Sequence, residues 1–139
     1  MNFLTLPGTY SVLRFPSESI PSIDFTQEDF VCLARTGDEV SVVCRTGLVY
    51  GAMREEGGWR VLKIQGPIDF GAVGVLAVAS GLLAAAGLSI FALSTFDTDY
   101  ILVKEASIDT AVEALERGGH HVEDAKPPAG RPFCRTEQA

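Results

Sequence analysis

Three aspartates border a long uncharged segment of this sequence. Asp69 precedes the segment, Asp97 and Asp99 follow it, and no side chain between Asp69 and Asp97 carries a charge. Carboxylates in such a cluster would stabilise an ammonium group by charge-assisted hydrogen bonds. Two simpler roles stay open, namely Asp69 as a helix N-cap and the other two aspartates as turn formers. Hydroxyl groups that could also contact a ligand belong to Ser94, Thr95 and Thr98.

The residues after Asp69 predict a helix that begins close to these carboxylates. The pattern over residues 71–86 is helical, with Asp69 as the N-cap, and Gly87 ends it. The first turn of a helix presents backbone N–H groups without partners and the positive end of the helix dipole. The loop up to Gly71 would therefore favour a ligand carboxylate.

Other chemistries find little support in the sequence. His120 and His121 are adjacent, and neighbouring residues on a strand point to opposite faces, so one metal ion could not easily reach both. The glycines follow neither the dinucleotide-binding nor the P-loop spacing. Cys44 or Ser94 would need a base within reach to act as a nucleophile. We therefore expect no catalytic residues, no metal site and no cofactor.

Composition limits the cellular setting and the partners. The chain has 139 residues, 47% of them hydrophobic, and a formal net charge of −7. A phosphate backbone would be repelled by this charge, so we expect no nucleic acid partner. The cysteines, Cys32, Cys44 and Cys134, show neither a disulfide pattern nor zinc-ligand spacing. Buried free thiols in a reducing cytoplasm are the simplest interpretation.

The uncharged segment is longer than the roughly 20 apolar residues that cross a bilayer as a helix. Gly87 divides it, however, because residues 88–95 predict a strand. Both flanks are acidic, so the positively charged anchor of a membrane span is missing. The first residues also lack the basic region of a secretory signal. We expect a helix and a strand packed inside a protein, and no membrane association.

From residue 59 onward the predicted elements follow the order β-α-β-β-α-β, which is the split βαβ or ferredoxin-like arrangement. The strands are predicted at 59–65, 88–95, 100–104 and 121–123, and the helices at 71–86 and 107–117, the second capped by Ser107. The first half repeats this order weakly, with strands at 10–15, 30–35 and 39–45 and a polar loop at 54–58. The connection at 16–24 holds at most a short helix, and residues 48–53 could form a single helical turn.

This order predicts two related lobes, residues 1–58 and residues 59–124, followed by a disordered proline-rich tail at 125–139. The helix at 71–86 is apolar all round, with small residues such as Gly74, Ala77 and Gly81 on the side that its own sheet does not cover. The other lobe or a second chain would cover that side, and we therefore expect a homodimer.

Four runs of residues resemble the ACT domain. They are GPIDF at 66–70, GVL at 74–76, AGLSI at 86–90 and STFDTDYILV at 94–103. The likeness extends over about 59–120, and it is strongest to bacterial tandem-ACT proteins related to the CASTOR arginine sensors and to the regulatory part of aspartate kinases. The pattern Ser-Thr-x-x-Thr-Asp-Tyr-x-Leu-Val is its most specific part.

This resemblance implies an α+β fold of two ferredoxin-like (βαββαβ) ACT lobes, the N-terminal one degenerate. It also implies a free amino acid or related metabolite bound between lobes, where a loop and helix start of one lobe meet the second strand of the other. The implied protein is a regulator without catalytic activity that signals to an unidentified partner. The ligand-binding positions so implied are Asp69, Phe70, Gly71, Ser89, Ile90, Thr95, Phe96, Asp97 and Asp99.

Two other functions remain compatible with the sequence. A structural interaction or dimerisation module with a vestigial pocket would dimerise without responding to a ligand. A small enzyme on a ferredoxin-like fold would have a polar cleft with a residue of perturbed pKa. Phe96 could also be no more than a core aromatic residue.

Overall fold

The computed structural model describes residues 1–126, in which β-strands dominate and helices are few. The predicted tail lies almost entirely outside the described residues. The strands are β1 (Asn2–Thr5), β2 (Tyr10–Phe15), β3 (Cys32–Arg35), β4 (Val40–Arg45), β5 (Arg54–Ile64), β6 (Phe91–Ser94), β7 (Asp99–Lys104) and β8 (His121–Asp124). The α-helices are α1 (Val75–Ala85) and α2 (Ile108–Arg117), and the 3₁₀ turns are η1 (Phe25–Gln27) and η2 (Glu105–Ser107).

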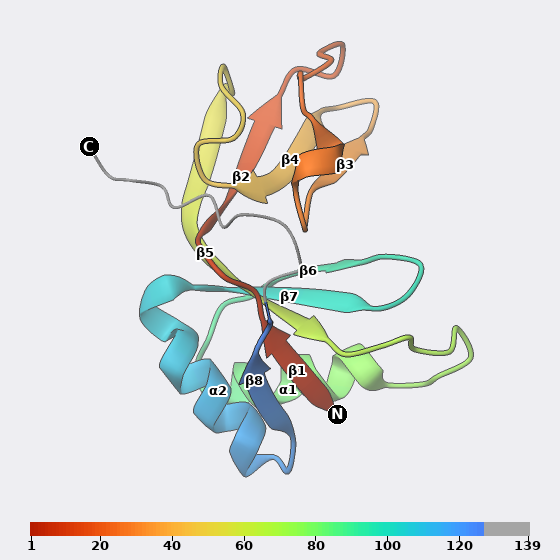
Figure 1. Ribbon diagram of the computed structural model, residues 1–139, viewed down its shortest axis with the longest axis vertical. Helices are drawn as coiled ribbons and strands as arrows, with labels where there is room; N and C mark the ends of the chain where they lie inside the picture. Colours follow the sequence, from red (N-terminus) through yellow and green to blue (C-terminus); the bar gives the residue numbers. More distant parts are fainter. Residues whose placement is uncertain (127–139) are drawn as a thin grey trace.

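The strand β5 runs through the whole molecule and joins two groups of strands (Figure 1). Its first half pairs with β2, which continues through β4 to β3; we call β2, β3 and β4 the N-terminal strand group. Its second half pairs with β7 on one side and β1 on the other. β6 extends the sheet beyond β7 and β8 extends it beyond β1, so β1, β6, β7 and β8 form the C-terminal strand group.

The predicted polar loop at 54–58 is wrong, because these residues are the beginning of β5. Glu55 and Glu56 pair with Leu13 and Val12 of β2, and their charged side chains are exposed on the sheet surface. Strand pairing thus overrides the polar composition. Residue 58 lies inside β5.

The weak helices that the sequence allowed within 16–24 and 48–53 do not form. Residues 16–24 contain no helix, and the 3₁₀ turn η1 follows them at Phe25–Gln27. Gly47 and Gly51 have positive φ angles of 86° and 85°, which a right-handed helix does not contain, and residues 48–53 are irregular.

Strand β1 was not expected from the sequence. It lies between β5 and β8, antiparallel to the first and parallel to the second, with Phe3 opposite both Ile64 and Val122. The Phe3 side chain has no exposed surface. The ferredoxin-like sheet therefore contains an extra strand from the start of the chain, so that β8 pairs with β1 and not with β5.

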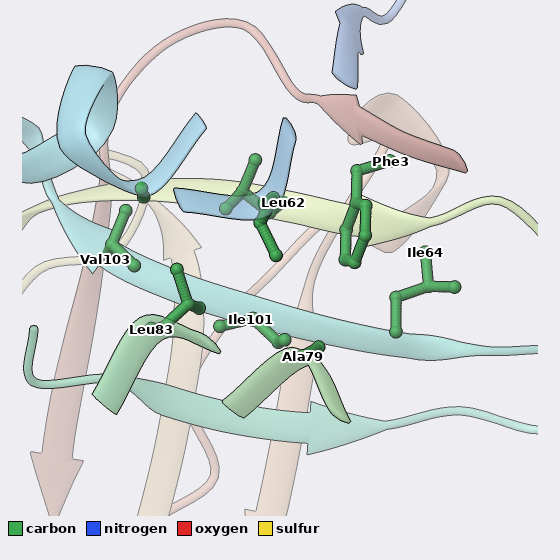
Figure 2. Packing of buried hydrophobic residues seen from close by; sticks show 9 residues of the cluster. Phe3, Leu62, Ile64, Ala79, Leu83, Ile101 and Val103 are labelled. Carbon is green, nitrogen blue, oxygen red and sulfur yellow. The ribbon is translucent and has the colours of Figure 1, made fainter. Parts of the chain in front are cut away.

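Both helices cover one face of the C-terminal strand group. Figure 2 shows side chains from α1, β1, β5 and β7 meeting in this core. Alternation along β7 divides its side chains, because Ile101 and Val103 face the helices while Leu102 faces the other way. On that other face, Leu102 belongs to a cluster that contains Tyr10 and Val43 of the N-terminal strand group, Trp59 and Val61 of β5, and Phe30.

The order of elements predicted from residue 59 onward is confirmed, with changed boundaries. Helix α1 begins at Val75 and not at residue 71, because Gly74 has a left-handed backbone with φ of 78° and occupies the N-cap. It ends before Gly87, whose φ is also 78°, as expected. The following strand is shorter than predicted, and the helix α2 starts after Ser107, whose side chain makes no capping bond.

The uncharged segment does divide at Gly87 into a helix of 11 residues and a strand. Among residues 1–126, none of the helices is both long and apolar enough to span a bilayer.

Cys32 and Cys44 are free thiols on the adjacent strands β3 and β4, and Cys134 lies outside the described residues. Burial, followed by the nearby carboxylates of Glu28 and Glu55, raises the pKa of Cys44 to about 11. The thiol therefore stays protonated at neutral pH, and its reactivity should rise only as the pH approaches that value. At pH 8 we expect iodoacetamide to label Cys44 at least about a hundredfold more slowly in the native than in the denatured chain.

Peptide mass mapping would measure this rate at each cysteine separately. Cys32 is the internal comparison, because it is only half-buried, although burial also raises its pKa. Equal native and denatured rates at Cys44 would contradict the packing of β4.

Candidate functional site

A groove of about 410 Å³ lies between the loop that follows β5, the first turn of α1 and the turn between β6 and β7. Its lining consists of residues 68–70, 72, 74–77 and 94–99. The groove therefore joins two segments that are far apart in the sequence, and both belong to the C-terminal strand group or its connections.

Hydrogen bonds hold the two segments together behind the groove. The Ile68 backbone N–H donates to the Asp97 carbonyl at 2.7 Å, and the Thr98 hydroxyl donates to the Ile64 carbonyl at 2.5 Å. Gly66 lies against the same turn, where a Cβ atom would come within 3.0 Å of the Asp97 carbonyl oxygen. A side chain at this position would therefore require the two segments to shift apart by a few tenths of an ångström.

Three carboxylates line the groove. An Asp69 oxygen accepts a hydrogen bond from the Gly71 backbone N–H at 2.7 Å, so Asp69 closes a tight loop and does not cap α1. One Asp99 oxygen accepts the Ser94 hydroxyl, while Asp97 is exposed at the tip of the turn. Burial, followed by the charge on Asp97, raises the pKa of the neighbouring Tyr100. The groove thus has a negative side made mainly by the β6–β7 turn.

The beginning of α1 also lines the groove. The first helical bond runs from the Val78 N–H to the Gly74 carbonyl, and no side chain caps the helix. The N–H groups of Val75, Leu76 and Ala77 therefore have no acceptor inside the helix. Since no acidic side chain occupies the first turn, this end keeps its positive character and can stabilise an anion.

Two phenylalanines form an apolar rim. Phe70 comes from the loop after β5 and Phe96 from the β6–β7 turn, and their rings meet edge to face with centroids 4.9 Å apart. They are 76% and 81% exposed, respectively. The alternative role of Phe96 as a core aromatic residue is therefore wrong. A rim of two exposed rings beside charged groups suits a ligand or surface with both apolar and polar parts.

The structure brings together most of the sequence-predicted ligand positions. Asp69, Phe70, Thr95, Phe96, Asp97 and Asp99 line the groove. Gly71 is adjacent to it through its bond to Asp69, whereas Ser89 and Ile90 lie after α1 and do not line it. Ile90 packs against the core beneath the helices, and Ser89 is exposed.

Sequence reasoning did not single out Val75 to Ala77 as groove residues, because it placed the helix start four residues too early. The signal that could have corrected it is Gly74, the last glycine before the continuous helical run.

The two histidines lie away from this groove. The Nδ1 atom of His120 is 2.7 Å from the backbone nitrogen of Met1, and His121 Nε2 is 3.6 Å from a Glu123 oxygen. Across the part of the chain that the structure describes, His, Cys, Asp and Glu side chains form no group of three or more that could hold a metal ion.

Comparison with known proteins relates this geometry to a family. Residues 54–117 match the family model of the ACT domain. The human protein named cytosolic arginine sensor for mTORC1 subunit 1 is 42% identical over 60 residues, which are 42% of this chain and 18% of that protein. The chain therefore matches less than a fifth of the length of this relative.

Two solved structures show how far the fold is shared. Protein Atu0741 from Agrobacterium tumefaciens superposes with a TM-score of 0.78 at 29% identity, covering 91% of this chain and 94% of that one. Aspartate kinase from Synechocystis superposes with a TM-score of 0.59 at 15% identity, covering 91% of this chain and 28% of that one, which shows the fold alone. The chain thus carries, over residues 54–117, a segment that matches the ACT domain, as the resemblance of its sequence indicated.

Proposed function

We propose that this chain is a regulatory protein without catalytic activity that binds a free amino acid in the groove. The observation that carries the proposal is that the uncapped start of α1 and the carboxylates of the β6–β7 turn line the same groove. The N–H groups of residues 75–77 suit an α-carboxylate, and Asp97 and Asp99 suit an ammonium group. The ACT-domain match and the arginine-sensor name of the human relative support this class of ligand.

The chain would consist of two lobes, residues 1–58 and residues 59–124. The first lobe would be a degenerate copy of the second, which is ferredoxin-like. The strand β5 would be shared by both, since residue 58 lies within it. Two copies of the chain would form a homodimer that closes the open side of the groove, where Phe70 and Phe96 are exposed. Ser89 and Ile90 are outside the groove of their own chain, so they would contact the ligand only from a partner copy.

Regulation would follow from differential affinity. A ligand that bridges the two sides of the groove, or two copies of the chain, stabilises the arrangement to which it binds more tightly. It can shift the equilibrium between arrangements only by this difference in affinity. A regulated partner protein would then recognise that arrangement. The free thiols of Cys32 and Cys44 favour a cytoplasmic location, which is also the compartment in the name of the human relative.

A thermal-shift panel of the twenty amino acids at millimolar concentration tests the proposal. We expect at least one of them, with L-arginine examined first, to raise the unfolding temperature. A ligand at about 100 times its dissociation constant adds roughly 2.7 kcal/mol to the free energy of unfolding. An unchanged unfolding temperature with all twenty would contradict the proposal.

The alternative of a structural module rests on the outer face of α1. Ala77, Val78 and Gly81 are exposed there, and the helix has no charged residue. A module of this kind would form stable dimers and give no response in the amino-acid panel. Because the proposed sensor is also a homodimer, stable dimers in sedimentation measurements would favour the module only together with a flat amino-acid panel.

A further inference from the structure

Thr98 is unusual among the residues of the β6–β7 turn because it is buried. Only 4% of its surface is exposed, whereas the neighbouring Phe96 is 81% exposed. A threonine that merely offered its hydroxyl to a ligand would point into the groove. The Thr98 hydroxyl instead donates a hydrogen bond to another part of the protein.

The partner of this hydroxyl is the carbonyl of Ile64, the last residue of β5. The antiparallel register between β5 and β7 ends at the pair Lys63 and Tyr100. Beyond that pair, at the residue after Lys63 and two residues before Tyr100, the Thr98 hydroxyl donates to the Ile64 carbonyl at 2.5 Å. The side chain therefore continues the ladder by one bond and satisfies a carbonyl at the point where the strand ends.

Two further contacts reinforce the same place. The carbonyl of Asp97 accepts the Ile68 N–H at 2.7 Å, on the other side of the cis peptide bond between Gly66 and Pro67. A Cβ atom on Gly66 would lie 3.1 Å from the Thr98 Cβ atom, so these residues are already in close contact. We call Gly66, Ile68, Asp97 and Thr98 the turn junction.

We infer that Thr98 is a positioning residue, whose buried hydroxyl fixes the β6–β7 turn against the loop that leads into α1. Because Asp97 and Asp99 flank Thr98, the junction sets how their carboxylates face the first turn of the helix. The importance of this geometry for a ligand rests on the proposed function, but the junction itself does not.

Residue-resolved hydrogen exchange of the ligand-free protein tests the inference. Thr98→Val keeps the shape and removes the hydroxyl, which leaves the Ile64 carbonyl without its donor. We expect exchange of the Ile68 N–H to become about tenfold faster, while amides in α2 keep their rates. Thr98→Ser should restore the Ile68 rate to within about twofold, and Thr110→Val, an exposed threonine on α2, is the matched control.

A substitution in the other segment of the turn junction tests the inference if Thr98→Val does not fold. Gly66→Ala places a methyl group against the Asp97 carbonyl and should also accelerate exchange at Ile68 selectively. Unchanged exchange at Ile68, or equal acceleration of every amide, would overturn the inference. A flat amino-acid panel would count against the proposed function and leave the exchange result standing.

Discussion

A fragment of residues 54–126 is expected to remain unfolded, although it contains the whole segment that matches the ACT domain. In the full chain, β8 pairs only with β1 among the described strands, and β1 also pairs with the end of β5. Removing β1 takes away both ladders and the buried Phe3. The loss of Phe3 alone is worth about 3–5 kcal/mol, against a total stability of about 5–15 kcal/mol for a typical domain. Circular dichroism during thermal unfolding would show no cooperative transition for the fragment.

A pair of substitutions in β1 gives a graded control. Phe3→Ala in the full chain should lower the free energy of unfolding by about 3–5 kcal/mol, because a fully buried ring is lost. Asn2→Ala, at an exposed position of the same strand, should change it by less than about 0.5 kcal/mol. A fragment that unfolds cooperatively at the temperature of the full chain would show that β1 is dispensable.

The second large effect concerns the charge of Asp99. Asp99→Asn keeps an oxygen that can accept the Ser94 hydroxyl, so the turn should hold its shape while one negative charge is lost. Hydrogen bonds to charged groups are worth about 1.5–3 kcal/mol, which corresponds to roughly 10- to 150-fold weaker binding of an amino acid. Isothermal titration calorimetry with the amino acid that stabilises the protein most would measure the change.

Asp38→Asn is the matched control, because this exposed aspartate lies in the turn between β3 and β4 and not in the groove. It removes the same charge from the chain and should leave the affinity within about twofold. Equal weakening by both substitutions would mean that net charge, and not the position of Asp99, determines binding.

The C-terminal half of the fold follows from local signals in the sequence. Gly87 and Gly118 end the two helices, and the apolar run from Tyr100 to Val103 predicts the strand that the structure shows there. These signals depend on residues that are close in the sequence, so they can be recognised without knowing which distant strands pair.

The errors arose where distant pairing decides the structure. Glu55 and Glu56 are poor strand residues by composition, yet β2 provides partners for their backbone. Phe3 belongs to a four-residue strand whose stability depends on residues 64 and 122. Propensity within a short window contains no information on either pairing, so neither the first half of β5 nor β1 could be predicted.

The residues of the groove could be predicted in part from the sequence. Asp69, Asp97 and Asp99 were identified because carboxylates suit an ammonium group and because the resemblance to the ACT domain implied these positions. The burial of Thr98 could not be foreseen, because its partner is a backbone carbonyl 34 residues earlier. A hydroxyl that contacts a ligand and one that satisfies a strand end look the same in a sequence.

Chemical-shift mapping of the ¹⁵N-labelled chain, titrated with the amino acid that the thermal panel selects, tests the central claim most directly. If the ligand carboxylate binds the start of α1 and its ammonium group binds the turn, the largest amide shifts will fall at residues 74–77 and 95–99. Shifts that cluster elsewhere in the chain, or their absence at saturating ligand, would contradict the assignment of this groove as an amino-acid site.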